Sequence, residues 1–369
     1  MLPYDARLIP STNVRGVPRR EHCSVHHSQI ATIGRLAGQQ VRIERYAPNG
    51  GQLLDRALST VIGVHDEDPD AVFVGYRDPE STHHDLRDRL GLPGTDPFTG
   101  KINTQVPNPD LTDDKAEEHS EFVERLTDNG RHKGLIVIAP HGGRIERHTD
   151  EQAERVGQKL ASRCVSVWLC KGFRKDGGAF DRWHITSTDI NEESFPKLKT
   201  VIGRHFEYAL AFHGWNEDSI CIGGSAPPDL KQEIKTTIIT EVPGLEGKVK
   251  TDVEGCPEAF NGNDPKNVVN RLARNGVQIE QSEDARRTYG VKIADAVAAV
   301  IGPKIKVCTA PVFGGSSAGG CLLRGVGYSL LVIPLIPLAW VPPIRCEIKR
   351  LVFRIRNCRS GNTDPCIEL

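Results

Sequence analysis

The hydrophobic pattern divides the chain into a first part of short strands and a second part in which strands alternate with helices. In the first part, short runs rich in valine and isoleucine are separated by Gly, Pro and Asp, as is typical of strands joined by turns. We therefore expect residues 21–110 to form a small β-rich, barrel-like domain after a flexible N-terminus at residues 1–20. The runs lie at residues 39–46, 58–66 and 70–78, and the pattern at 30–43 predicts a helical turn that leads into a strand.

The second part, residues 111–304, alternates apolar runs with amphipathic stretches. The run at 134–140 is apolar almost throughout, which is typical of a strand buried on both faces. Thr149 is a candidate N-cap of the helix predicted at 149–163. This alternation predicts an α/β domain with a mostly parallel or mixed central sheet flanked by helices. Further strands are expected at 165–172, 208–215 and 219–224, and a strand that runs into a loop is expected at 276–286. Further helices are expected at 108–130, 194–205, 227–242 and 266–275.

The pattern changes after about residue 301. Residues 327–344 are apolar over 18 positions but contain four prolines. Because a proline inside a helix costs about 3 kcal/mol, we expect no stable membrane-spanning helix here. We interpret residues 305–369 as an atypical Cys- and Pro-rich tail, which is either a functional module or a frameshifted end.

The net charge, the N-terminal sequence and the cysteines indicate which binding partners and which cellular compartment to expect. The formal net charge is −1, which argues against nucleic acid as a partner. The N-terminus shows no apolar stretch of signal-peptide length, and the ten cysteines form no CxxC pair. We therefore expect reduced thiols in a cytoplasmic protein without membrane association. The sequence leaves the oligomeric state open.

Ionisable side chains directly follow three of the apolar runs, namely His141, His213 and Glu280. Ligands of open α/β sheets bind beyond the carboxyl ends of the strands, so we expect these side chains to meet. Glu146 lies in the loop after His141, and two histidines with one carboxylate are the usual protein ligands of a catalytic zinc. The sequence therefore predicts one Zn²⁺ per chain at His141, Glu146 and His213. The alternative is that these are ordinary polar residues at strand ends.

Four motifs in this order resemble the poly-gamma-glutamate hydrolase family: PHGGRIE, WHITST, FHGW and ICIGG, within roughly residues 120–300. That family is known from bacteriophages, bacteria and archaea and consists of zinc peptidases with a carboxypeptidase-like fold. The resemblance implies that His141, Glu146 and His213 are the zinc ligands, with the His-x4-Glu spacing of this family. It also implies a zinc-dependent hydrolase that cleaves gamma-glutamyl amide bonds in poly-gamma-glutamate or a related gamma-linked polymer. A phage-derived member would reach its substrate after release by lysis.

Zinc hydrolysis needs a group that accepts the proton of the attacking water and passes it to the leaving amine. Glu280 is the catalytic candidate, because it ends a strand as the base of carboxypeptidase-like enzymes does. The alternative is a surface carboxylate near Glu283 and Asp284. His184, in the WHITST motif, either lines the substrate cleft, orients a metal ligand from behind, or is a core histidine.

A gamma-glutamyl polymer is a polyanion, so its cleft needs cationic side chains. Lys171, Arg174 and Lys175 lie in and around a Gly-rich loop that follows a predicted strand, and Arg271 lies on the helix predicted at 266–275. Together with His184, we take Arg174, Lys175 and Arg271 as candidate substrate-binding residues. The alternative is that these charges are simply solvated.

Other functions remain open to test. The Gly-x-Ser-x-Gly match at 315–319 is typical of serine hydrolases, but no histidine follows His213, so the usual order of the triad cannot be completed. A catalytically inactive member that binds a peptide or a sugar would hold no zinc. A carboxypeptidase-like enzyme could also act on another amide, such as cell-wall peptide, and only substrate assays separate it from a gamma-glutamyl hydrolase.

Overall fold

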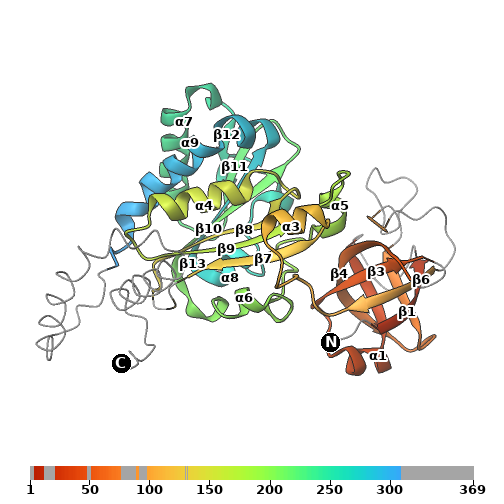
Figure 1. Ribbon diagram of the computed structural model, residues 1–369. Helices are drawn as coiled ribbons and strands as arrows, with labels where there is room; N and C mark the ends of the chain where they lie inside the picture. Colours follow the sequence, from red (N-terminus) through yellow and green to blue (C-terminus); the bar gives the residue numbers. More distant parts are fainter. Residues whose placement is uncertain are drawn as a thin grey trace, which may run out of the picture. The chain divides into compact units, whose positions relative to one another are not determined.

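A computed structural model describes residues 4–11, 21–47, 51–75, 89–90, 98–128, 130 and 132–308 (Figure 1). These residues belong to one compact unit that ends at Cys308. The apolar stretch at 327–344 and the Gly/Ser-rich stretch at 315–319 lie outside the described residues, as does the tail from residue 309 onward. Within the described part of the chain, no helix combines the length and apolar character needed to cross a membrane.

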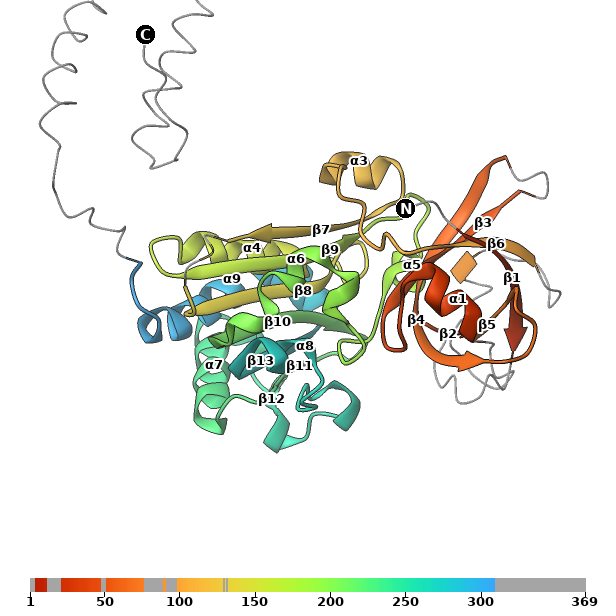
Figure 2. The ribbon, with the colours of Figure 1, turned by 90° about the horizontal axis from the view of Figure 1, so that it is seen from below.

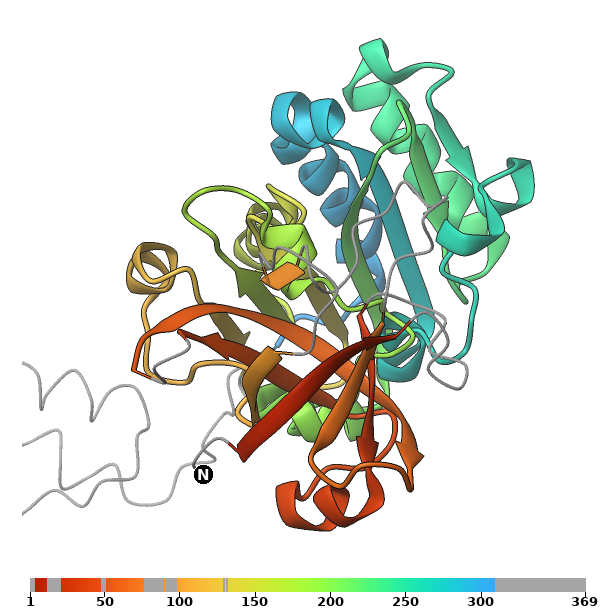
Figure 3. The same cartoon turned by 90° about the vertical axis from the view of Figure 1, so that its right-hand side faces the viewer.

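Six strands of the first part form a closed barrel, in the spatial order β1-β5-β2-β4-β3-β6 (Figure 3). Closure leaves no unpaired strand edge. Apolar side chains such as Leu8, Val41 and Val72 fill the interior. The prediction of a small β-rich part before the α/β part is confirmed, but Tyr4–Ser11, within the predicted flexible N-terminus, is strand β1 of the barrel. The elements are β1 Tyr4–Ser11, β2 His22–His26, α1 His27–Ile33, β3 Gln40–Tyr46, β4 Leu53–His65, β5 Ala71–Gly75 and β6 Phe98–Asn103.

The second part is built on a seven-stranded sheet with the order β12-β11-β13-β10-β8-β9-β7 (Figure 2). Its four central strands, β13, β10, β8 and β9, are parallel. β7 and β11 pair antiparallel with their inner neighbours β9 and β13, so the sheet is mixed, as the sequence predicts. The strands are β7 Phe122–Thr127, β8 Leu135–Gly143, β9 Val165–Gly172, β10 Phe206–Trp215, β11 Ile220–Gly223, β12 Val249–Thr251 and β13 Ala273–Ser282.

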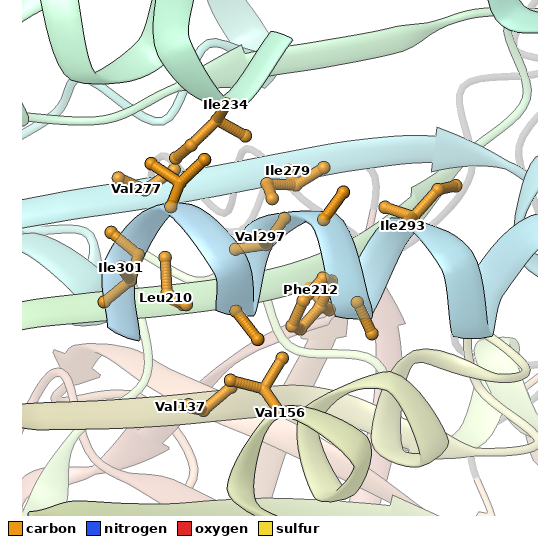
Figure 4. Packing of buried hydrophobic residues seen from close by; sticks show 14 of the residues in the cluster. Val137, Val156, Leu210, Phe212, Ile234, Val277, Ile279, Ile293, Val297 and Ile301 are labelled. Atoms are coloured by element: carbon orange, nitrogen blue, oxygen red, sulfur yellow. The ribbon is translucent and has the colours of Figure 1, made fainter. Parts of the chain in front are cut away.

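Helices cover both faces of this sheet, and alternate strand residues pack against each layer. On one face, Val137 of β8 and Phe212 of β10 pack with Val156 and Val297 of the helices (Figure 4). On the other face, the neighbouring strand residue Ile138 is buried in a second cluster. Burying one such side chain stabilises the fold by about 1.5–3 kcal/mol. The first face carries α4 Thr149–Lys159, α7 Pro228–Glu241 and α9 Glu283–Ile301, and the second carries α5 Ala179–Trp183, α6 Pro196–Lys199 and α8 Val268–Leu272.

Three local predictions are wrong. Thr149 is the first residue of α4 and not its N-cap, which is His148. The helix predicted at 108–130 is only the short α3, Asp113–Glu118, and the residues after it form strand β7. The backbone hydrogen bonds of β7 with β9 outweigh the weak helical spacing of its apolar residues. The loop predicted at the end of 276–286 is the start of the long helix α9, in which the Ser282 hydroxyl accepts a hydrogen bond from the Ala285 N–H as N-cap.

The expectation of reduced thiols is wrong for four cysteines. Cys164 is bonded to Cys308, and Cys221 is bonded to Cys256. The partners are separated by 144 and 35 residues, so their spacing in the sequence does not indicate the pairing. Among the described cysteines, Cys23 and Cys170 are buried free thiols.

Candidate metal and catalytic centre

The carboxyl ends of β8, β10 and β13 bring four predicted residues together. β10 lies between β8 and β13, and its register sets His213 directly beside Glu280. His141 lies near the end of β8, and Glu146 lies in the turn that follows. All four side chains are buried. The surface position considered for Glu280 is therefore wrong, whereas Glu283 and Asp284 are exposed on α9.

Three of these side chains form a triangle of ligand atoms. Nδ1 of His141 lies 3.2 Å from Nδ1 of His213 and 3.1 Å from Oε1 of Glu146. Nδ1 of His213 lies 3.4 Å from Oε2 of Glu146. Two ligand atoms that each lie about 2.1 Å from a tetrahedral ion are roughly 3.4 Å apart. The triangle therefore has the size that a zinc ion requires.

Hydrogen bonds outside the triangle orient its members. Nε2 of His141 lies 2.8 Å from the Ile185 carbonyl oxygen, which can only accept, so Nε2 donates and Nδ1 of the neutral ring presents its lone pair to the triangle. The Gly214 N–H donates to Oε2 of Glu146 at 2.9 Å. Such outer hydrogen bonds are typical of metal ligands, and these residues fit a divalent metal ion.

The pKa values of the two carboxyl groups of the centre, Glu146 and Glu280, are shifted in opposite directions. Burial opposes the ionisation of Glu146, but the imidazoles of His141 and His213 hold its pKa well below the usual range. Burial raises the pKa of Glu280 to about 8, and the charge of Glu146 adds to this rise. The Gln278 amide donates to Oε1 of Glu280 at 2.9 Å and acts in the opposite direction. Divergent pKa values at one site are typical of acid–base chemistry.

His184 also lies in this cluster. Its ring centroid is 4.3 Å from that of His141, and its Nε2 lies 3.9 Å from Oε1 of Glu146. His141, Glu146 and His184 could therefore also hold an ion, but the distances of His213 to the same partners are shorter and favour His213 as the ligand. Burial and the neighbouring His141 lower the pKa of His184 to about 3, so its imidazole is neutral at physiological pH.

Arg286, which the sequence analysis missed, ties the ends of the site together. Its Nε donates to the Arg147 carbonyl at 2.9 Å, and its Nη1 donates to the Gln281 carbonyl. The guanidinium passes so close to Gly214 that a Cβ there would lie 2.0 Å from Nη1, so a larger residue would displace the guanidinium. Arg286 therefore links the loop of Glu146 to the end of β13. Arg286 could not be recognised from the sequence, because helix α9, which carries it, was not predicted.

Barrel residues brace the loop that carries His184, and the sequence did not indicate this. Nη2 of Arg89 donates to the carbonyls of Arg182 and His184, at 3.1 and 3.3 Å. The Thr186 hydroxyl donates to Oε1 of Glu21 at 2.7 Å. The loop's geometry thus depends on side chains far away in the sequence.

Most of the predicted cationic residues contact other parts of the chain. Lys171 is buried and paired with three carboxylates, Asp113, Asp150 and Glu154, so it adds no positive charge to a cleft. Arg174 donates to the Gly177 carbonyl, and the Lys175 side chain is exposed. Arg271 lies before β13, at the opposite end of that strand from Glu280.

Arg271 nevertheless lines two hollows of the described surface. The larger, about 880 Å³, lies at the starts of β10 and β13, at the opposite end of these strands from His213 and Glu280. The smaller, about 400 Å³, is also lined by Lys266 and by residues 188–192, which follow the loop of His184. The guanidinium of Arg271 donates to the Ile190 carbonyl at 2.7 Å and pairs with Glu192. Substrate binding by Arg174, Lys175 and Arg271 remains a prediction.

Comparison with known proteins identifies relatives. The family described as poly-gamma-glutamate hydrolase matches residues 110–294, which contain all four motifs. The SPbeta prophage-derived UPF0714 protein YoqZ of Bacillus subtilis (strain 168) is 26% identical over 156 residues, which are 42% of this chain and 50% of that protein. The chain thus spans about half the length of this relative.

Solved structures are also similar. A bacteriophage poly-gamma-glutamate hydrolase is 23% identical, with a TM-score of 0.41 over 52% of this chain and 95% of that one. A metallo-carboxypeptidase from Burkholderia cenocepacia is 12% identical, with a TM-score of 0.33 over 56% of this chain and 73% of that one.

Proposed function

Because the chain belongs to the poly-gamma-glutamate hydrolase family, we propose that it is a zinc-dependent hydrolase of gamma-glutamyl amide bonds. His141, Glu146 and His213 would hold one zinc ion. The observation that carries this proposal is the buried triangle of their ligand atoms, with Glu280 on the adjacent strand directly beside His213.

A zinc ion at this position would polarise the scissile carbonyl and lower the pKa of water to about 7. Glu280 would take the proton of the attacking water and return it to the leaving amine. Its position supports this role, because Glu280 is buried on the strand beside His213. The hydrogen bond from Gln278 orients one carboxyl oxygen. His184, neutral and beside His141, would line the substrate cleft.

The substrate class rests on the family and on charge. The similar bacteriophage structure is described as a poly-gamma-glutamate hydrolase. A polyanion needs cations along its path. Lys266 lines the hollow beside residues 188–192, where Arg271 is paired with Glu192, and Lys175 is exposed in the loop after β9. We propose a gamma-glutamyl polymer as the substrate. A carboxypeptidase-like activity on another amide, such as cell-wall peptide, is the alternative.

The disulfides bear on where the protein works. Disulfides persist in oxidising surroundings and are rare in the reducing cytoplasm. The similar YoqZ is prophage-derived by name. We propose that the protein is phage-related and acts after release from the cell by lysis, with Cys164–Cys308 and Cys221–Cys256 formed.

Incubation of the zinc-loaded chain with poly-gamma-glutamate, followed by product sizing, tests the proposal. Alpha-linked polyglutamate of equal length and charge is the matched control. We expect shortening of the gamma-linked polymer only, at a rate that falls as salt increases. Equal rates on both polymers would indicate an ordinary carboxypeptidase. Zinc binding without cleavage of either polymer would contradict the proposed substrate, and a chain that binds no zinc would indicate an inactive binding protein.

The ligand assignment has its own test, which needs no substrate. His141→Ala should lower the bound zinc by one equivalent per chain, measured by metal analysis after dialysis, while the circular dichroism spectrum persists. His205→Ala is a control, because His205 lies before β10 and therefore far from the carboxyl end of that strand. A His141→Ala variant with the same zinc content and affinity as the unchanged chain would show that the ligand set is wrong.

A further inference from the structure

The carboxyl ends of two neighbouring barrel strands carry a second group of metal-ligand side chains. β2 and β4 run parallel, and their register sets His26 directly beside His65. The next residue on each side is again a potential ligand, His27 after β2 and Asp66 after β4. The similar segments SVHHS and GVHDE are thus brought side by side by the strand register, although almost 40 positions separate them in the sequence.

Three of these side chains are close enough to share one ion. His26, His27 and Asp66 each offer a ligand atom within 4.8 Å of the other two. The rings of His26 and His27 have centroids 4.2 Å apart, and Nδ1 of His27 lies 2.8 Å from Oδ1 of Asp66. Ligand atoms on one zinc ion are at most about 4.2 Å apart, twice a bond of about 2.1 Å. Small rotations of the exposed His27 and Asp66 side chains would bring the ligand atoms from within 4.8 Å to within about 4.2 Å of one another.

His26 is the buried anchor of this group. Its Nδ1 lies 2.7 Å from the Ser28 hydroxyl oxygen. In this structure Nδ1 also accepts from the Ser28 backbone N–H at 3.3 Å. With the hydrogen moved to Nδ1, the ring would donate to the Ser28 hydroxyl oxygen and present the Nε2 lone pair to a metal ion, which is the usual way in which a protein orients a ligating histidine. The buried ring of His65 packs edge-on against His26, with centroids 5.5 Å apart, and limits its rotation.

We propose that His26, His27 and Asp66 form a second metal site, for Zn²⁺ or another first-row divalent ion that accepts imidazole nitrogen. Two imidazoles and one carboxylate are suitable zinc ligands, and hard Mg²⁺ or Ca²⁺ would require more oxygen atoms. Because His27 and Asp66 are exposed, water would complete the coordination, and the ion would exchange more readily than at the buried centre. It would tie β2, β4 and the start of α1 together, and so stabilise the barrel.

The test uses the full chain with His141→Ala and His213→Ala, so that the buried centre cannot take up metal. After removal of metal with a chelator, calorimetric titration with Zn²⁺ should show about one equivalent bound. In this background, His27→Ala and Asp66→Asn should each weaken binding roughly 10–100-fold. His148→Ala is the matched control, because Nδ1 of His148 lies 3.1 Å from Oε2 of Glu151, a histidine–carboxylate pair outside both proposed ligand sets. It should leave binding unchanged.

A second measurement covers the case in which that double variant does not fold. In the otherwise unchanged chain, His27→Ala should remove one equivalent of zinc and leave hydrolysis unaltered, so the result is independent of the proposed enzymatic function. Binding that persists in both His27→Ala and Asp66→Asn would overturn the proposal. So would equal weakening by His148→Ala, or zinc content in the otherwise unchanged chain that His27→Ala does not alter.

Discussion

Removal of the disulfide between Cys164 and Cys308 is a perturbation whose size follows from the structure. In the chain-entropy account, a cross-link restricts the unfolded chain by an amount that grows with the logarithm of the loop length. The bond closes a loop of 144 residues, which corresponds to about 5 kcal/mol at 25 °C. The 35-residue loop of Cys221–Cys256 corresponds to about 3.8 kcal/mol.

The native contacts around the outer bond do not depend on it. The Arg163 guanidinium donates to the Ile305 carbonyl at 2.7 Å, and the Ile305 side chain is buried in the core. Removal of the bond therefore acts mainly by lowering the free energy of the unfolded state. We expect the double variant Cys164→Ala/Cys308→Ala to lose roughly 3–5 kcal/mol of unfolding free energy. Turnover should stay unaltered, because Cys164 precedes β9, at the opposite end of the parallel strands from His141.

Urea unfolding without reductant, followed by tryptophan fluorescence, measures this loss. The double variant Cys221→Ala/Cys256→Ala is the comparison and should lose about 1 kcal/mol less, because its loop is shorter. Reductant should lower the unfolding free energy of the wild type, and should lower that of the outer-bond variant by a smaller amount, because this variant has one disulfide fewer to lose. Equal unfolding free energies for the wild type and the outer-bond variant would refute the reasoning, as would free thiols at both positions in a non-reduced peptide map.

Three further predictions follow from single side chains. Glu280→Gln should keep the bound zinc but lose at least about a hundredfold in turnover, because an amide cannot accept a proton; near-normal turnover would place the base elsewhere. Hydrogen bonds from Arg204 lower the pKa of Asp128 to about 2, against about 3.9 in an unfolded chain. The stabilisation that ionised Asp128 contributes is therefore full above about pH 4 and lost as the pH falls through 2. Asp128→Asn should make the unfolding free energy depend less on pH in this acid range, and an unchanged dependence would contradict the assignment. Arg286→Lys should lower zinc affinity and turnover about 10–100-fold, because an ammonium cannot reach both the Arg147 and Gln281 carbonyls; metal binding at wild-type strength would argue against a positioning role.

The hydrophobic pattern by itself determined the central strands. The apolar runs at 134–140, 165–172 and 208–215 coincide closely with β8, β9 and β10, because a strand covered on both faces must be apolar at nearly every position. The same pattern located the strand ends, so it also found His141 and His213 before any contact was visible. In parallel strands the carboxyl ends share one edge of the sheet, and local sequence is therefore enough to group such residues.

Tertiary structure alone decided the features that depend on partners distant in the sequence. Residues 122–127 are a strand because β9 supplies their hydrogen bonds, and no local signal encodes that partner. The same holds for the disulfides, for Arg286 over Gly214, and for the bracing of the His184 loop by barrel side chains. It also holds for His26 and His65, which become neighbours only through the register of β2 and β4. Periodicity reports which face of an element is buried, whereas pairing and register depend on how the whole chain packs.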